Sequence, residues 1–263
     1  PPDPRWGTAD EFRRFIAYAR EKGNLVVPYT NFSWWGVNSP TLRNLPDGVR
    51  LEEIVVKRKN GDIIKEDYGP HSGYVMNPGD PFVRNRIAEE HRRLLDVGVD
   101  GIFEDQWGIR NTPYVFNGTV VTGADPSNAY IEALRQYLDS IRHPMYVEDG
   151  FDVLADDAVG FMGSVLLWNK LGYRPKTAAY TSYYPMMGML ARDKVMQFQH
   201  NLAKETMTMS REILRWNLAM GYHLNADLTG GTDNPWIDVV GVFQKHVLAK
   251  YADRRVESFK EAG

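Results

Sequence analysis

The sequence contains no cysteine, which excludes disulfide bonds and thiolate metal sites and leaves the cellular compartment open. It has no apolar run near the ~20 residues of a membrane span and no stretch that resembles a signal peptide. The net charge at pH 7 is only -3, and the basic residues are scattered. A near-neutral chain without a basic tract is unlike a nucleic-acid-binding protein, so we expect no nucleic-acid partner and no membrane span.

Other common signatures are missing too. No Gly-rich phosphate loop follows a predicted strand, since Gly69-Pro70 and Gly230-Gly231 are typical of loop breakers. The six histidines show neither His-x-His nor His-Glu-x-x-His spacing. These two absences count against a nucleotide-binding doubly wound fold and against a metal-dependent hydrolase.

The helices are predicted by their caps. Thr8 and Glu11 fit a capping box that opens an N-terminal helix. Three further helix starts each pair a capping side chain with proline at the first helical position: Asp80-Pro81, Asp125-Pro126 and Asn234-Pro235. The amphipathic runs behind them predict helices over 82–97, 127–142 and 236–251. A long stretch over about 193–219 also has a helical pattern, with an internal break possible.

Short β-like runs alternate with these helices, each apolar first and polar at its carboxyl end. They cover 25–31, 73–77, 101–105, 145–149, 178–184 and 222–228. Such alternation predicts βαβ units and a parallel sheet. The run Ile54 to Ile64 predicts a hairpin around Asn60-Gly61, inserted at about 53–69. Residues 151–168 fit either a helix or a short helix followed by a further strand.

The predicted fold class is therefore α/β, a (β/α)8 TIM barrel of one catalytic domain over residues 1–263. The six or seven strands counted are fewer than the eight that a barrel needs. We expect the first strand to lie upstream of Pro1, and flanking domains to belong to the same polypeptide. An open doubly wound sheet is the second possibility.

The most informative segment runs from Gly98 to Trp107, where a short apolar strand ends in two adjacent acids. Parallel α/β folds place their chemistry at the carboxyl ends of strands. Because side chains alternate across a strand, only one of the two acids can point into the mouth of a barrel. Asp105 is the better candidate; Glu104 is expected to pair with a Lys or Arg of a flanking helix, or to hydrogen-bond the base of the site.

Glu148 and Asp149 end the strand of the next βα unit in the same way. Two carboxylates on neighbouring strands suggest the acid/base machinery of a glycosidase, ~5–5.5 Å apart in a retaining enzyme and ~6.5–9.5 Å apart in an inverting one. Sequence leaves the choice between the two mechanisms open. Helix capping is the structural alternative for Asp149.

The run Asn77-Pro78-Gly79-Asp80-Pro81, followed by a helix and then by Gly98 to Asp105, resembles the region around the fourth strand of retaining α-glycosidase barrels. The α-galactosidases, α-glucosidases and endo-α-N-acetylgalactosaminidases share this arrangement. The resemblance implies that Asp105 is the nucleophile. It implies Glu148 as acid/base if the endo-α-N-acetylgalactosaminidases are the guide, or Asp227 if the α-galactosidases are.

Further polar and aromatic residues at strand ends are expected to bind a sugar, because aromatic rings stack on the apolar faces of sugars and polar groups hold their hydroxyls. The predicted substrate-binding residues are Tyr29, Asn31, Trp34, Trp35, Asn77, Glu104, Gln106, Trp107, Asp149, Tyr184, His223, Asn225 and Asp227.

The predicted function is thus a glycoside hydrolase that cleaves an α-linked oligo- or polysaccharide and needs no metal or organic cofactor. A secreted or periplasmic location follows only from the expected polysaccharide substrate. Two alternatives stay open. One is a carbohydrate-binding barrel without catalysis, and the other is a metal-dependent hydrolase using His223 and Asp227 with Glu104 or Asp105.

Overall fold

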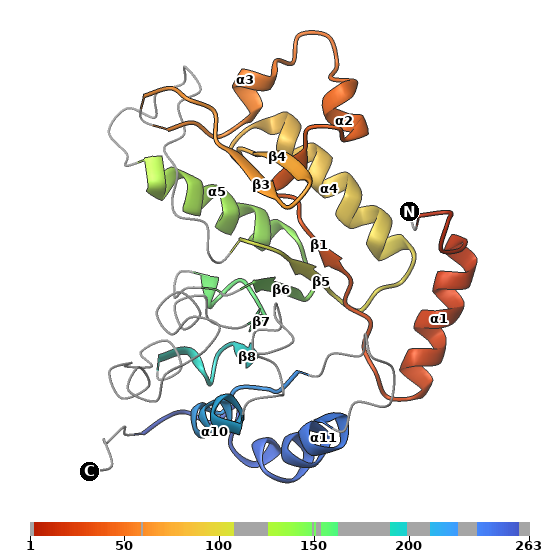
Figure 1. Ribbon diagram of the computed structural model, residues 1–263, viewed down its shortest axis with the longest axis vertical. Helices are drawn as coiled ribbons and strands as arrows, with labels where there is room; N and C mark the ends of the chain where they lie inside the picture. The colour runs from red at the N-terminus through yellow and green to blue at the C-terminus, as the bar shows by residue number, and fades with distance from the viewer. Residues whose placement is uncertain are drawn as a thin grey trace. The chain divides into compact units, whose positions relative to one another are not determined.

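The computed structural model divides the chain into two compact units, residues 1–145 and 146–263, which we describe in turn (Figure 1). The residues it describes are 3–58, 60–107, 126–148, 150, 154–162, 190–198, 211–225 and 236–257. Within these ranges no helix is both long enough and apolar enough to pass through a bilayer.

The helices of the first unit begin where the caps predicted. Helix α1 (Ala9–Glu21) opens with the Thr8–Glu11 capping box. Helix α4 (Pro81–Asp96) starts after Asp80, whose side chain accepts the first two free backbone N–H groups of the helix. Helix α5 occupies Pro126–Ser140, and two single-turn helices, α2 (Pro40–Arg43) and α3 (Leu51–Ile54), lie in between. Side-chain caps therefore mark the starts of α1 and α4.

Two parallel strands form the sheet of this unit, β1 (Tyr29–Thr30) and β5 (Ile102–Glu104), which lie side by side in Figure 1. Their register pairs Tyr29 with Phe103 and Thr30 with Glu104. On the other side of β5, the N–H of Ile102 donates to the carbonyl of Pro144, immediately before β6 (Met145–Glu148). Ile102 is fully buried, which places β5 in the core.

A second, antiparallel sheet in the order β2-β4-β3 combines Trp34–Gly36, His71–Val75 and Lys65–Tyr68. The prediction that 73–77 forms a parallel strand is wrong, because β4 pairs antiparallel with both neighbours. The reason is the tight Gly69-Pro70 turn, where Gly69 has a φ of +58°. A two-residue turn can join only antiparallel strands.

The hairpin predicted at Asn60-Gly61 is present and continues this antiparallel arrangement. Lys57 bridges Ile63, and the N–H of Arg58 donates to the carbonyl of Asp62 at 2.8 Å. Within the described part of the loop, Gly61 supplies a left-handed φ of +91°.

In the second unit β6, β7 (Gly160–Met162) and β8 (Met196–Phe198) pair in parallel, in the order β6-β7-β8. Of the two possibilities for 151–168, the strand is correct at β7. The prediction of helix from residue 193 is wrong, because β8 precedes helix α10 (Arg211–Met220). Burial alternates along β8 with the period of two of a strand, a signal too short to separate from a helix in sequence.

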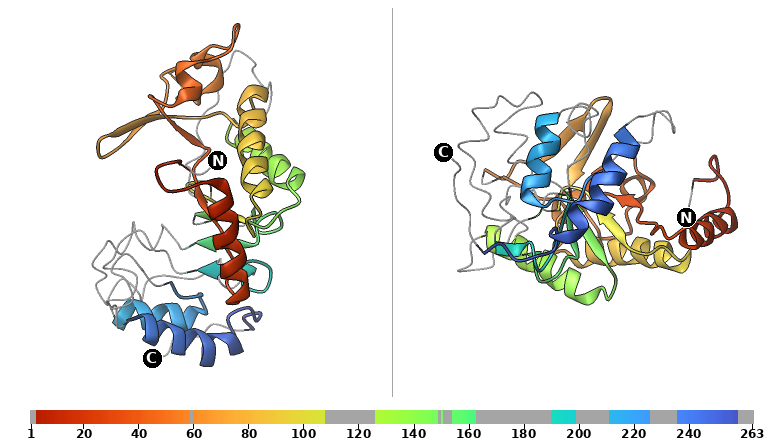
Figure 2. Two further views of the ribbon diagram at one scale, coloured as in Figure 1. Left: turned by 90° about the vertical axis from the view of Figure 1, so that its right-hand side faces the viewer. Right: turned by 90° about the horizontal axis from the view of Figure 1, so that it is seen from below.

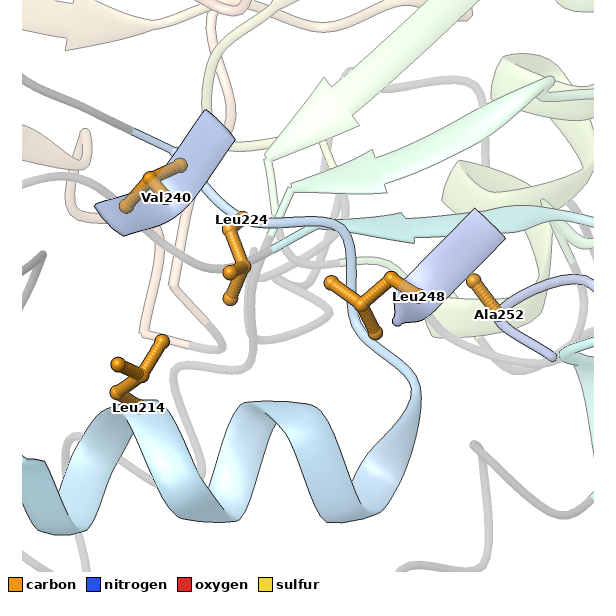
Figure 3. Packing of buried hydrophobic residues seen from close by; sticks show 5 residues of the cluster. All are labelled: Leu214, Leu224, Val240, Leu248 and Ala252. Carbon is orange, nitrogen blue, oxygen red and sulfur yellow. The ribbon is translucent and has the colours of Figure 1, made fainter. Parts of the chain in front are cut away.

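The hydrophobic core of the second unit forms between α10, α11 (Trp236–His246) and the 3-10 turn Leu248–Lys250. Figure 3 shows the buried members, Leu214, Leu224, Val240, Leu248 and Ala252. Figures 1 and 2 show α10 and α11 as neighbours, as this shared core requires.

The described residues thus combine parallel strands with α-helices, which confirms the predicted α/β class. The predicted strand at 178–184 lies outside the described residues. The predicted strand at 222–228 is represented, in its described part, by a parallel bridge between Phe198 and His223. Closure of the strands into a barrel stays a prediction.

Candidate active site

The residues just before β5 hold the start of this strand in place. Gly98 adopts a φ of +91°, which ends α4 with the left-handed conformation that favours glycine. Asp100 then accepts the N–H of Val26 at 2.8 Å and the guanidinium of Arg20 at 2.7 Å. The lead-in to the strand therefore ties α4, α1 and the approach to β1 together.

Asp105 follows β5 directly and is 7% exposed. Its N–H donates to the carbonyl of Thr30 at 2.8 Å, which continues the parallel register one step beyond the strand. Its Oδ2 accepts a hydrogen bond from the side-chain amide of Asn31 at 2.9 Å. The sheet register and the side-chain bond together fix this carboxylate at the carboxyl end of the strand.

Asn31 organises the residues around Asp105. The same amide nitrogen that reaches Asp105 donates to Oε1 of Gln106 at 3.1 Å. Its carbonyl oxygen accepts the hydroxyl of Ser33 and the N–H of Trp34, each at 3.1 Å. Both ends of the Asn31 amide are thereby engaged, so its orientation is determined by its neighbours.

Gln106 has a φ of +66°, and no other non-glycine residue described in this chain has a positive φ. A left-handed conformation costs a residue with a Cβ about 1–2 kcal/mol, and such residues concentrate at functional sites. The Gln106 side chain is held from two sides, by Asn31 and by the hydroxyl of Tyr68 from the antiparallel sheet.

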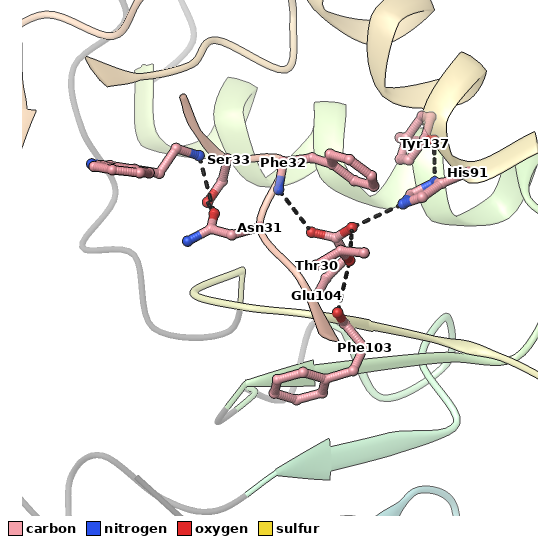
Figure 4. Close-up of polar contacts among 9 residues, drawn as sticks. Thr30, Asn31, Phe32, Ser33, His91, Phe103, Glu104 and Tyr137 are labelled. Atoms are coloured by element: carbon pink, nitrogen blue, oxygen red, sulfur yellow. Dashed lines mark hydrogen bonds and ion pairs between the residues drawn. The ribbon is translucent and has the colours of Figure 1, made fainter. Parts of the chain in front are cut away.

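Glu104 is completely buried, and three protein groups surround its carboxylate (Figure 4). Thr30 Oγ1 lies 2.7 Å from Oε1, the N–H of Phe32 3.2 Å from Oε2, and Nε2 of His91 2.8 Å from Oε1. The partner from the flanking helix is thus a histidine, where a Lys or Arg was the expectation from the sequence.

His91 connects Glu104 to a second buried group. Its Nδ1 faces the hydroxyl of Tyr137 from α5, and the ring of Phe32 packs edge-on against the imidazole at 4.6 Å. Burial, and then the negative charge of Glu104, raise the pKa of the Tyr137 hydroxyl well above its usual range. Sequence reasoning missed both residues, although His91 continues the buried face of α4 set by Val83 and Ile87.

The other predicted residues of the first unit occupy different environments, and their role as sugar ligands stays a prediction. Trp107 is 1% exposed and packs on Tyr137, and Trp35 is buried against Phe82.

Asn77 is buried, and its side-chain oxygen accepts the N–H of Gly79. Near Asp105, the ring of Trp34 meets that of Tyr68, with the ring centroids 5.7 Å apart. Tyr29 is 61% exposed beside Phe103.

In the second unit, Glu148 ends β6 and is 2% exposed. His223 contacts Asp253 through Nε2 at 2.9 Å and Gln244 through Nδ1 at 2.8 Å, so both of its ring nitrogens are engaged by protein groups. Asn225 lies against the sulfur of Met162.

Three predicted site residues lie outside the described part of the chain: Asp149, Tyr184 and Asp227. Among the residues that are described, no three His, Asp or Glu side chains gather as a metal site.

A family model, described as a domain of unknown function (DUF6259), matches residues 2–145, which is more than half of the chain. The chain belongs to the DUF6259 family. The matched stretch includes Glu104, Asp105 and the residues that hold them. No curated protein matches the sequence.

This DUF6259 chain has the fold of several solved glycosidases at low sequence identity. It is similar to the GalNAc complex of an α-N-acetylgalactosaminidase from Bifidobacterium bifidum, with 10% identity, a TM-score of 0.67 and coverage of 94% of this chain and 40% of that one. It is also similar to an α-galactosidase from Thermus thermophilus, with 13% identity, a TM-score of 0.55 and coverage of 88% of this chain and 52% of that one. A GH31 sulfoquinovosidase from E. rectale has 14% identity and a TM-score of 0.52, with coverage of 92% of this chain and 37% of that one.

These likenesses establish a glycoside hydrolase-like fold. The chain spans 37% to 52% of the length of the three structures. The activities in their names are properties of those proteins.

Proposed function

We propose that this DUF6259 chain is the catalytic part of a retaining glycoside hydrolase that cleaves an α-linked oligo- or polysaccharide. The observation that carries the proposal is the placement of Asp105 just beyond β5, mostly buried and held by the amide of Asn31. A nucleophilic carboxylate needs this combination of fixed orientation and an ionised form favoured by a donor.

The proposed reaction uses two carboxyl groups. Asp105 attacks the anomeric carbon as the bond to the leaving oxygen breaks, and Glu148 gives that oxygen its proton. Glu148 then takes a proton from water, which attacks the same carbon, releases Asp105 and yields the sugar with its configuration retained. The proposal requires the two carboxyl groups to lie ~5–5.5 Å apart in a (β/α)8 barrel. No metal or organic cofactor takes part.

The fold likeness supports the substrate class, because the similar structures include an α-N-acetylgalactosaminidase and an α-galactosidase. We propose that the domain acts within a longer, secreted or periplasmic polypeptide, where polysaccharides are met. Asp149, Tyr184 and Asp227 stay candidate sugar ligands within this proposal, together with the residues around Asp105.

The test is hydrolysis of α-linked disaccharides, 4-nitrophenyl α-glycosides and α-glycosyl fluorides of galactose, N-acetylgalactosamine and glucose by the wild type, Asp105→Asn and Glu148→Gln. We expect Asp105→Asn to abolish turnover on every substrate. Glu148→Gln should lose about 10²–10⁴-fold on substrates with poor leaving groups. Its kcat/KM should fall far less on a glycosyl fluoride, because fluoride leaves without a proton in the first step.

Asp10→Asn serves as the control, since it makes the same substitution at an exposed carboxylate of α1 that contacts Arg13. The configuration of the first-formed product, followed by NMR, separates retention from inversion. A wild type that binds glycans without turnover would contradict the proposal and favour a carbohydrate-binding role. Full activity in Asp105→Asn would show that another residue is the nucleophile.

A further inference from the structure

The fully buried carboxylate of Glu104 is unusual because it is supported by polar groups alone. Removing a carboxylate from water is costly unless its oxygens are hydrogen-bonded. Here Thr30 and His91 share Oε1, and the N–H of Phe32 occupies Oε2. With 0% exposure, Glu104 cannot itself reach a substrate. Its function must pass through the groups that it binds.

The hydrogens of this cluster can be assigned from its donors. The buried hydroxyl of Tyr137 has a raised pKa and keeps its proton, so it is able to donate to Nδ1 of His91. The proton of a neutral imidazole then lies on Nε2, where it donates to Glu104. The Thr30 hydroxyl has one hydrogen and two acceptors, Glu104 at 2.7 Å and the carbonyl of Phe103 at 2.8 Å. The charged carboxylate is the stronger of the two acceptors.

Two of the groups that Glu104 binds flank the residue that holds Asp105. Thr30 and Phe32 are the immediate neighbours of Asn31, whose amide donates to Asp105 and Gln106. Figure 4 shows Thr30 and Phe32 facing the Glu104 carboxylate, with the side chain of Asn31, the residue between them in the sequence, pointing away from it. One carboxylate thus fixes the chain on both sides of a single side chain.

We propose that Glu104 is a positioning residue: oriented by His91 and Tyr137, it clamps Thr30 and Phe32 and thereby holds the Asn31 amide against Asp105. The two adjacent acids of the strand end then have separate roles. Asp105 reacts with the substrate, and Glu104 fixes the segment Thr30 to Phe32, whose Asn31 side chain orients Asp105. The clamp rests on the proposed function only in so far as Asp105 is the nucleophile.

The test compares two replacements of Glu104. Glu104→Met keeps the length of the side chain and removes both acceptor oxygens. Glu104→Gln keeps one acceptor oxygen for the N–H of Phe32, and its amide nitrogen can donate to Nε2 of His91 once the imidazole proton moves to Nδ1. We expect Glu104→Met to lower kcat about 10²-fold, the loss caused by a small misplacement, with KM nearly unchanged. Glu104→Gln should restore most of kcat. An equal loss in both variants would overturn the clamp, because the charge would then act directly.

Coupling to Asn31 separates positioning from general destabilisation. In a double-mutant cycle with Asn31→Ala, Glu104→Met should add no more than about threefold to the loss caused by Asn31→Ala alone. Losses that multiply would overturn the proposal. If Glu104→Met does not fold, Thr30→Val removes one contact of the clamp and should show the same coupling. Glu53→Met is the control, the same substitution at a partly exposed carboxylate whose partner is Arg50, and kcat should be unchanged.

Crystal structures test the clamp without reference to activity. The Asn31 amide should leave Asp105 in Glu104→Met and stay near its 2.9 Å distance in Glu104→Gln. An unchanged contact in both variants would overturn the clamp even in an active enzyme. A wild type that hydrolyses no glycoside would instead refute the proposed function, and the two failures are therefore distinguishable.

Discussion

The side-chain amide of Asn31 donates to the carboxylate of Asp105 across 2.9 Å and joins residues 74 positions apart. The contact follows from the sheet. Thr30 and Glu104 are register partners in the parallel pair of β1 and β5, so the next residue along each strand lies beside the other. Two residues expected at separate strand ends are therefore parts of one hydrogen-bonded arrangement.

The first prediction concerns this contact. Asn31→Asp replaces the donor by a second carboxylate of the same size, and like charges at this distance cannot both stay ionised. We expect kcat/KM at neutral pH to fall about 10–100-fold, the value of one hydrogen bond to a charged group. The measurement is kcat/KM across about pH 4 to 8, a range that spans carboxyl and imidazole titration.

Asn38→Asp is the matched control for this variant. It makes the same substitution at a residue whose side-chain oxygen accepts from Arg43 on the surface. Its kinetics should be those of the wild type. A similar loss in both variants would mean that added charge alone, and no contact with Asp105, lowers the activity.

The sequence predicts the helices of the first unit well because their caps are local. The Thr8 capping box and the Asp80-Pro81 start need only the few residues that follow them. Strand direction depends on partners and turn lengths, which is why 73–77 was expected in the wrong sheet. Met196–Phe198 shows the same limit, because three residues are too few to set a period of two apart from a helix.

In the candidate site, too, local features could be predicted from the sequence and long-range contacts could not. The alternation of side chains in a strand predicts that Glu104 and Asp105 point to opposite faces, and their surroundings differ accordingly. The donors to Glu104 are Thr30 at the end of β1, Phe32 just beyond it and His91 on α4, and no spacing in the sequence links them. His91 and Tyr137 become visible only once two helices pack over one strand.

The second prediction uses a pair of glycines that face each other in the antiparallel sheet, Gly36 and Gly73. A Cβ at Gly73 would lie 2.1 Å from the Trp34 ring, whereas a Cβ at Gly36 would meet nothing closer than 3.8 Å. We expect Gly73→Ala to destabilise the protein by about 1–3 kcal/mol through overpacking. Gly36→Ala should change stability by about 0.5 kcal/mol or less.

Thermal melting of both variants and the wild type provides the measurement. Displacement of the Trp34 ring by Gly73→Ala should also change its near-ultraviolet circular dichroism. Equal melting temperatures for the two variants would mean that the Trp34 ring can leave Gly73 at no cost, and that the close packing of the ring on the glycine does not stabilise the sheet.

The last prediction concerns Asp100, the acid that ties α1 to the start of β5. Burial raises its pKa, but the N–H of Val26 and the guanidinium of Arg20 together lower it by more, so the pKa lies below its ordinary value. A folded-state pKa below the unfolded value of about 3.9 means that the unfolded state binds the proton more readily. The stabilisation is therefore complete above the unfolded pKa and is lost as the pH falls through the folded one.

Asp100→Asn should accordingly melt at a lower temperature than the wild type near neutral pH, and the two melting curves should converge in acid. Arg20→Gln removes the guanidinium and leaves the Val26 contact, so its loss near neutral pH should be smaller than that of Asp100→Asn. Because Arg20 is 48% exposed, its share should also fall with added salt, whereas the backbone contact should not. A melting difference between Asp100→Asn and the wild type that stays constant down to low pH would show that the ionised form of Asp100 is not what joins α1 to the strand.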